Sequence, residues 1–164
     1  MNLEQLGQLG VFIAGAIPWF EAIAVVPAGI LFGLDPLWVV LAAIAGNALT
    51  IFVFAYFGAS IRGWVSKRRL AKGKPPELKR FEKAQQAFDR YGIYGLAALG
   101  PILVGTQFAA AIAVAVGVKP LKTALLITAG MVLWAVLVAI PFTLLGPLDF
   151  QASVRFVTNF DLLL

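Results

Sequence analysis

Four long apolar blocks alternate with short polar or basic stretches along the chain. They cover residues 10–33, 37–58, 93–117 and 121–146. A helix needs about 20 apolar residues to cross the hydrocarbon core of a bilayer, and these blocks are too long and too uncharged for core helices of a small soluble protein. The pattern predicts an all-α integral membrane protein with a single membrane domain over residues 1–164.

Composition places the chain in the same class and excludes much chemistry. Hydrophobic residues make up 61% of the chain and charged residues 13%, against about 45 to 50% and 25% in soluble domains. There is no cysteine and no histidine, which excludes disulfides, thiolate nucleophiles, imidazole bases and the common zinc sites. We therefore expect no enzyme activity, no cofactor and no metal site.

The basic residues are concentrated between the second and third blocks. Ten of the 13 basic residues and three of the eight acids lie between Arg62 and Arg90, which gives this stretch a formal charge of +7. The positive-inside rule makes residues 62–90 cytoplasmic, in a cell (inner) membrane that the chain crosses several times. This placement of charge beside apolar blocks also argues against a nucleic-acid partner.

The basic linker, residues 59–92, is predicted to contain an amphipathic helix from Pro76 that lies along the membrane surface. One interpretation is a solvated connector that only fixes topology. The other is contact with anionic lipid headgroups, because basic clusters beside a membrane attract them. The candidate headgroup contacts are Lys67, Arg68, Arg69, Lys79 and Arg80.

Two repeats, residues 10–58 and 93–146, resemble each other at an offset of 84 residues, and residues 147–164 form a tail. "GLDPL" at 33–37 is matched by "GVKPL" at 117–121, and Gly46 by Gly130. Chance similarity among glycine-rich apolar segments is the alternative. If the first block of each half dips in and returns while the second crosses, the repeat is inverted. Asp35 and the tail then lie outside, and Lys119 lies inside with the linker; four straight crossings put Lys119 outside.

Proline and glycine interrupt the first block of each half, at Pro18, Pro27 and Gly29 and at Gly100, Pro101 and Gly105. Arms of about ten residues are ~15 Å long, half of the ~30 Å hydrocarbon core. Matched interruptions of this kind are the best sequence indication of a transporter binding site. We expect two re-entrant helical hairpins, each followed by a transmembrane helix; proline-kinked spanning helices are the alternative.

Glu21 is the only acid deep in any apolar block. A charged acid at the bilayer centre costs about 2.5 to 3.5 kcal/mol, and no lysine or arginine of the apolar blocks is available to pair with it. Its position favours a proton-coupling carboxyl. The alternative is an acid near the interface that snorkels or caps a short helix N-terminus. Asn47 beside Gly46, and Thr106 with Gln107 beside Gly105, are further candidates for substrate or proton binding.

The spacing of Glu21, Pro27, Gly29, Gly33 and Pro36, followed by Gly46 and Asn47, resembles the first half of the small multi-drug export protein family. In the second half the similar features are "YGIYGL", a Pro/Gly break with Gly105 and Thr106, and then Gly117 and Gly130. The resemblance covers roughly residues 15–140. That family in turn resembles the DedA/VTT (SNARE-associated) membrane proteins, which implies two facing re-entrant hairpins.

The chain also departs from that family pattern. Family members often carry a basic residue shortly after the acid, where this chain reads "EAIAVV". A fuller "PxPGTG"-like break is reduced here to "GPILVGTQ". Because the basic residue is missing, the resemblance does not carry over a cationic partner for Glu21.

Taken together, these features predict a transporter-like protein. We expect a proton-coupled carrier of a hydrophobic or amphipathic substrate, or a lipid carrier, with Glu21 as the coupling carboxyl. The expected partners are membrane lipids, that substrate, protons and a second copy in a homodimer. A non-transporting membrane interaction or scaffold protein, and a small multidrug resistance type drug/proton antiporter, are the alternative functions.

Overall fold

The computed structural model describes the backbone of residues 3–18, 20–75 and 79–161, and the side chains of 5–18, 20–61, 63–75, 79 and 82–146. All regular structure in these ranges is helical. The helices are α1 (Leu3–Ala16), α2 (Ala22–Leu31), α3 (Pro36–Leu70), α4 (Lys79–Leu103), α5 (Thr106–Ala115) and α6 (Pro120–Asp161).

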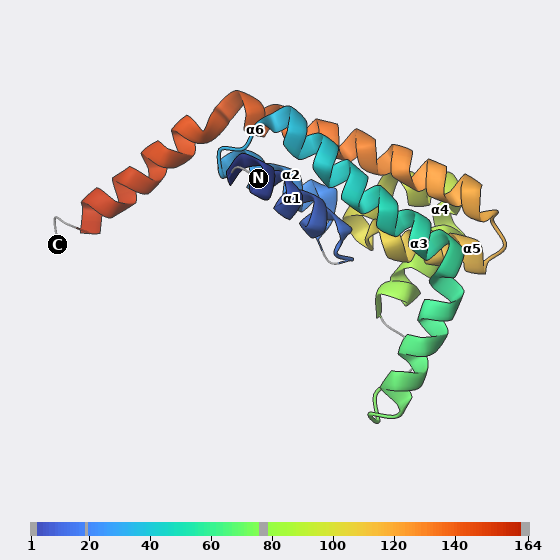
Figure 1. The fold of residues 1–164 in the computed structure, drawn as a ribbon. Coiled ribbons are helices and arrows are strands. Elements are labelled where there is room, and N and C mark those ends of the chain that lie inside the picture. The colour runs from blue at the N-terminus through green and yellow to red at the C-terminus, as the bar shows by residue number, and fades with distance from the viewer. Residues whose placement is uncertain (1–2, 19, 76–78, 162–164) are drawn as a thin grey trace.

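Two long helices form one side of the body. The ribbon shows α3 and α6 running side by side in opposite directions (Figure 1). The segments Pro36–Ile61 and Pro120–Gly146 have 26 and 27 residues, and both are long and apolar enough to cross a membrane by length and composition. The apolar stretches in helices α1, α2 and α5 are shorter, at 10 to 17 residues.

Helices α2 and α5 end in the same way. Each has 10 residues, and their first residues lie 84 positions apart. Each is followed by a glycine with positive φ, Gly33 at 81° and Gly117 at 99°. The residue after that glycine donates its N–H to the carbonyl five residues earlier. Glycine ends a helix in this conformation because it has no Cβ to clash.

Two glycines let pairs of helices touch backbone to backbone. A Cβ on Gly46 of α3 would collide with the carbonyl oxygen of Phe12 in α1, and a Cβ on Gly130 of α6 would collide with that of Ala97 in α4. The two glycines are also 84 positions apart. Helix α1 therefore packs closely on α3, and α4 on α6, with α2 and α5 completing the body.

Only two of the six residues expected to break the apolar blocks lie outside helices. Pro18 lies in the turn between α1 and α2, and Gly105 lies between α4 and α5. The other four, Pro27, Gly29, Gly100 and Pro101, are helical. A proline inside a helix removes one backbone hydrogen bond without always ending the helix, and both glycines serve packing, against Val39 and Ala109.

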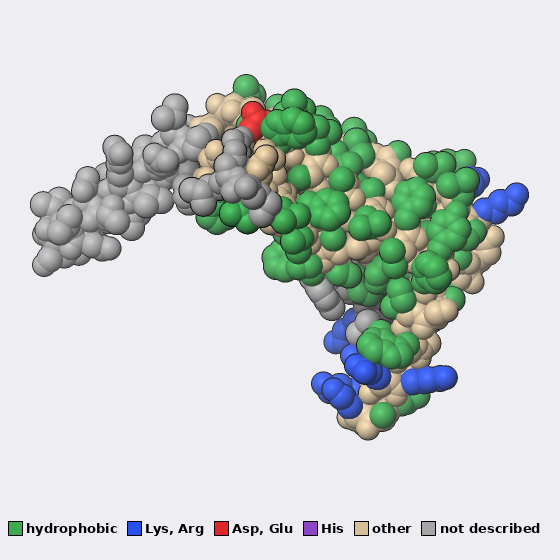
Figure 2. Space-filling model, in the orientation of Figure 1, with side chains coloured by type: hydrophobic (Ala, Val, Ile, Leu, Met, Phe, Trp, Pro, Cys, Tyr) green, Lys and Arg blue, Asp and Glu red, His purple; other side chains and the backbone are tan. Residues whose placement is uncertain are grey.

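The basic linker differs from the single surface helix that was expected. Helix α3 continues to Leu70, and α4 begins at Lys79 and changes direction at Gly92, where φ is 64°. The expected helix start at Pro76 lies outside the described residues. The end of α3 and the start of α4 project from the body as an arm (Figure 1) that carries most of the visible lysine and arginine side chains (Figure 2).

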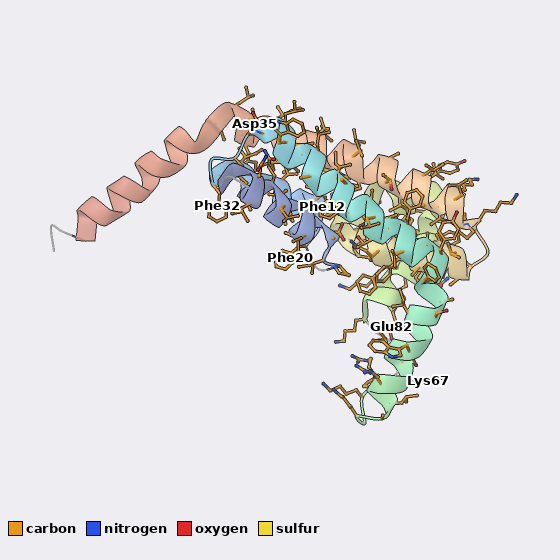
Figure 3. The ribbon with its side chains drawn as sticks, viewed as in Figure 1. Phe12, Phe20, Phe32, Asp35, Lys67 and Glu82 are labelled. Atoms are coloured by element: carbon orange, nitrogen blue, oxygen red, sulfur yellow. The ribbon has the colours of Figure 1, made fainter. Side chains whose placement is uncertain are left out.

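Charge is separated along the body. Asp35 caps the start of α3 at one end, where its side chain accepts a hydrogen bond from the Trp38 N–H at 3.1 Å. Figure 3 shows Lys67 and Glu82 on the arm, at the other end. Lys122 also lies at that other end, at the start of α6, with its Nζ 5.6 Å from the Tyr94 ring centroid. Helix α6 changes direction at Gly146, and its last stretch leads away from the body (Figure 1).

Candidate functional site

Glu21 lies at the N-terminal end of α2 but bonds to α5. Its backbone is extended, and its side chain forms no cap hydrogen bond to its own helix. Instead its Oε1 accepts the backbone N–H of Thr106, the first residue of α5, at 2.9 Å. The dipole of a helix favours an anion at this end. Glu21 therefore caps the N-terminus of a short helix, as the alternative interpretation expected. The helix that it caps is α5, which belongs to the other half of the chain.

A ring of three polar contacts surrounds the second carboxylate oxygen. Glu21 Oε2 lies 2.9 Å from Thr106 Oγ1 and 3.3 Å from Asn47 Nδ2. Thr106 Oγ1 also lies 2.9 Å from Asn47 Oδ1. Asn47 and Thr106 are fully buried, while Glu21 is half-buried. These contacts join α2, α3 and α5 at one point.

The ring has three contacts, but its neutral groups can direct only two hydrogens into them. Each of the three contacts needs one hydrogen between its two heavy atoms. The Thr106 hydroxyl supplies one, and Asn47 supplies one, because its amide turns NH2 toward one neighbour and its oxygen toward the other. Turning the amide over exchanges the neighbours and leaves two hydrogens. An ionised Glu21 therefore leaves one contact between two oxygens without a hydrogen.

A second layer of polar groups supports the ring. Gln107 Nε2 donates to Asn47 Oδ1 at 3.1 Å and to Thr50 Oγ1 at 3.2 Å. Thr50 in turn donates to the Asn47 carbonyl at 2.9 Å. Gln107 is fully buried, and within the described part of the chain its Oε1 has no hydrogen-bond partner. This layer fixes the position of the Asn47 side chain.

The structure thus brings together all four residues singled out in the sequence, Glu21, Asn47, Thr106 and Gln107. Thr50 was not singled out for the site, although it follows Asn47 by three positions and so shares its helix face. Lys83 was missed as well. Nothing in the sequence pattern pointed to it, because it belongs to the linker and is 62 positions from Glu21.

Lys83 changes the expectation that Glu21 has no cation nearby. The two residues line the same cavity of about 230 Å³, together with Pro101 and the residues up to Gly105. The expectation considered only bases inside the apolar blocks. Helix α4 carries Lys83 back to the body, where it reaches the α4–α5 break.

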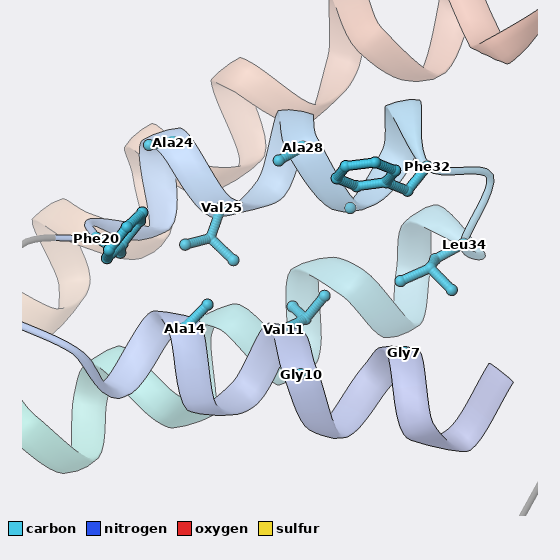
Figure 4. Close-up of a pocket in the computed structure, with 11 residues that line it drawn as sticks. Gly7, Gly10, Val11, Ala14, Phe20, Ala24, Val25, Ala28, Phe32 and Leu34 are labelled. Carbon is cyan, nitrogen blue, oxygen red and sulfur yellow. The ribbon is translucent and has the colours of Figure 1, made fainter. Parts of the chain in front are cut away.

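A separate apolar cavity of about 470 Å³ lies between α1 and α2. Figure 4 shows the two helices facing each other across it, with Phe20 and Phe32 near the two ends of α2 and Val11 and Val25 between the helices. Among the described residues that line it, none is charged. This lining favours apolar groups.

The expected headgroup contacts lie mainly on the arm. The Arg68 guanidinium lies 4.2 Å from the Trp64 ring centroid, and Arg69 Nε donates to the Pro75 carbonyl at 2.7 Å. Lys67 and Lys79 are exposed, and the Arg80 side chain lies outside the described residues. Among the described residues no group of three His, Cys, Asp or Glu side chains is placed to hold a metal ion.

These features describe an all-helical protein with two helices of membrane-spanning length and a polar cluster where its short helices meet. The chain belongs to the small multi-drug export protein family: residues 21–137 match the family described as "Putative small multi-drug export protein". The match covers more than two thirds of the chain and includes all four cluster residues. Neither a search of curated proteins nor one of solved structures finds a match.

Proposed function

We propose that the protein is a proton-coupled membrane carrier of an amphipathic substrate, in which Glu21 takes up and releases the coupled proton. The observation that carries this proposal is the ring of Glu21, Thr106 and Asn47. It lacks one hydrogen when the carboxyl is ionised and is complete when Oε2 carries a proton. The family's description as an export protein supports transport as the activity.

The helix lengths support an arrangement of two re-entrant hairpins, α1–α2 and α4–α5, each followed by a spanning helix, as in DedA/VTT-like proteins. Helices α2 and α5 have 10 residues each and are therefore ~15 Å long, half of the ~30 Å hydrocarbon core. The turns before them, with Pro18 and Gly105, would then lie at mid-membrane depth, where backbone needs cover from protein or a watery cavity; Gly105 is buried and Pro18 is half-buried.

The proposed topology places the arm and Lys119 in the cytoplasm, and Asp35 and the residues after Gly146 outside. Two features support it. The basic residues of the arm and of the α5–α6 turn lie at one end of the body, while Asp35 lies at the other. The matched positions of α2 with α5, 84 residues apart, support an inverted repeat.

In this mechanism the proton controls contact between the two hairpins. With Glu21 protonated, the ring is closed and the turn before α2 is held against α5. Loss of the proton leaves the Thr106 hydroxyl with one hydrogen for its two oxygen neighbours, Glu21 Oε2 and Asn47 Oδ1, so that one of these two contacts has no hydrogen. This weakens the junction of α2, α3 and α5 and favours separation of the hairpins. Substrate then enters or leaves between them.

Glu21→Gln tests the mechanism, because glutamine resembles the protonated acid and cannot release a proton. Proteoliposomes are given a pH gradient, and two probes are followed: ethidium as an amphipathic cation and fluorescent phosphatidylglycerol as an anionic lipid. We expect wild-type movement of at least one probe to depend on the gradient and the variant to lose that dependence. Gradient-driven rates that survive in Glu21→Gln would disprove the coupling role.

The matched control is Glu82→Gln, the same chemical change on the exposed face of the arm (Figure 3). It should keep the wild-type response to the gradient. If neither probe moves in wild-type protein at any gradient, the non-transporting interaction protein is the better description.

A further inference from the structure

Two cavities adjoin on the side of α4 that faces the α4–α5 break. The first, of about 230 Å³, is lined by Glu21 and Lys83. The second, of about 320 Å³, is lined by Lys83, Gln86, Arg90 and Tyr91. They share Lys83 and the residues at the end of α4. We call the combined depression the Lys83 groove.

The cationic and amide side chains of the groove come from one helix face. Lys83, Gln86 and Arg90 are separated by three and four positions, which places them on the same side of α4. The lysine ammonium has three N–H donors and the arginine guanidinium has five, and neither accepts. A ligand that matches this face is an anion with several acceptor oxygens, and phosphate is the common biological group of that kind.

Apolar surface adjoins the cationic face. Ile102 lines the first cavity, and Leu103 lines both; they are 54% and 52% exposed. Tyr91, at the other end, is 46% exposed, and the Arg90 guanidinium lies 5.2 Å from its ring centroid. A molecule with a phosphate and an apolar tail satisfies both surfaces, whereas a free phosphate uses only one.

We propose that the Lys83 groove binds the phosphate headgroup of an anionic membrane lipid, with the acyl chains against Ile102 and Leu103. The lipid would then be the amphipathic substrate of the carrier, and this last step rests on the function proposed above. Because Glu21 lines the same cavity as Lys83, the bound headgroup lies beside the coupling carboxyl. Of the cations that the sequence first suggested as headgroup contacts, Lys67, Arg68, Arg69 and Lys79 line neither of these two cavities.

The test uses purified full-length protein in neutral detergent, titrated with phosphatidylglycerol and followed by native mass spectrometry. Lys83→Gln with Arg90→Gln removes two charges from the groove, and Lys72→Gln with Lys74→Gln removes two exposed charges from the arm. We expect the groove variant to bind about 30-fold more weakly and the control within about twofold of wild type. Equal weakening in both would overturn the assignment.

Three further measurements identify the ligand. Phosphatidylcholine, which has no net charge, should bind clearly more weakly; equal binding would overturn the anionic class. Inorganic phosphate should compete only poorly with the lipid, and full competition at equal concentration would assign the groove to a soluble anion instead. The charge-keeping exchange of Lys83→Arg with Arg90→Lys should retain most binding, which separates loss of charge from loss of folding.

Failure of this inference and failure of the proposed function give different results. Glu21→Gln should bind phosphatidylglycerol at least as tightly as wild type, because it removes a negative charge beside the headgroup. If the groove variant loses lipid binding while Glu21→Gln keeps gradient-driven movement, the groove stands and the proton mechanism fails. If Glu21→Gln loses the gradient response and the groove variant binds lipid normally, the reverse holds.

Discussion

Helices α2 and α5 have the same length and the same kind of C-terminal end, but they lie in different surroundings. In α5 eight consecutive residues, from Thr106 to Ala113, are buried. In α2 only five of ten are buried, and the side toward α1 opens on an apolar cavity of about 470 Å³. One short helix is enclosed by its neighbours, and the other is open on one side.

The residue just before each of these two helices also differs between the halves. Gly105 precedes α5 with φ 97°, a conformation that disfavours residues with a Cβ. Glu21 holds the matching position before α2 and sends its carboxylate to the first N–H of α5. A shared architecture thus produces a site with one acid, because one half supplies the side chain and the other supplies the backbone donor.

Backbone contact at Gly46 and Gly130 is the strongest test of the match between the halves. Gly46→Ala and Gly130→Ala would each force a methyl group into a carbonyl of the neighbouring helix, and each should lower the free energy of unfolding by about 3 kcal/mol. Denaturation in mixed micelles measures this. Gly63→Ala, in open space on α3, should gain up to about 1 kcal/mol. If the two variants lost unequal amounts of stability, the two halves would not be packed in the same way.

A larger side chain should lower stability in α5 but hardly change it in α2. Ala109 of α5 is fully buried, so Ala109→Leu should cost about 2 kcal/mol through overpacking. Ala28 of α2 lines the apolar cavity, so Ala28→Leu should change stability by less than about 0.5 kcal/mol. Thermal unfolding of both variants in one detergent gives the difference. Similar losses would mean that the α1–α2 cavity is closed.

Removal of the Thr106 hydroxyl tests the polar cluster. Thr106→Val leaves Glu21 Oε2 and Asn47 Oδ1 without their shared partner, at a cost of about 1 to 2 kcal/mol, and Thr106→Ser should restore most of it. The control is Thr123→Val, since Thr123 is equally buried but its hydroxyl has no hydrogen-bond partner in the described ranges. Chemical denaturation compares them. If Thr106→Val were as stable as the wild type, the ring of contacts around Glu21 Oε2 would be contradicted.

Sequence reasoning located the helices and the cluster residues because both depend on local signals. Apolar blocks of 22 to 26 residues mark the long helices, and polar residues beside glycines mark places where backbones come close. It found the break in each half, at Pro18 and at Gly105, but it also expected breaks at residues that are helical in the structure. Pro27 and Pro101 are conspicuous in the sequence, yet a helix can continue through proline when packing compensates the lost hydrogen bond.

The remaining misses concern contacts between distant parts of the chain. The hydrogen bond from Thr106 to Glu21 joins residues 85 positions apart, and the approach of Lys83 depends on the change of direction at Gly92. No periodicity within one segment encodes such contacts, because they follow from how whole helices pack. A single sequence therefore gives the members of the cluster and leaves their partners to the structure.

The last prediction concerns the sides of the membrane to which the two hairpins open, and it is measured by labelling and not by stability. The chain has no cysteine, so Asp35→Cys and Lys119→Cys each provide one reactive thiol, just after α2 and α5 respectively. With an impermeant maleimide on intact cells, we expect labelling at position 35 and protection at position 119 until the membrane is permeabilised. Lys72→Cys on the arm is the protected reference. Labelling of both positions from outside would mean that the blocks cross straight through, and the two hairpins would then not be an inverted pair.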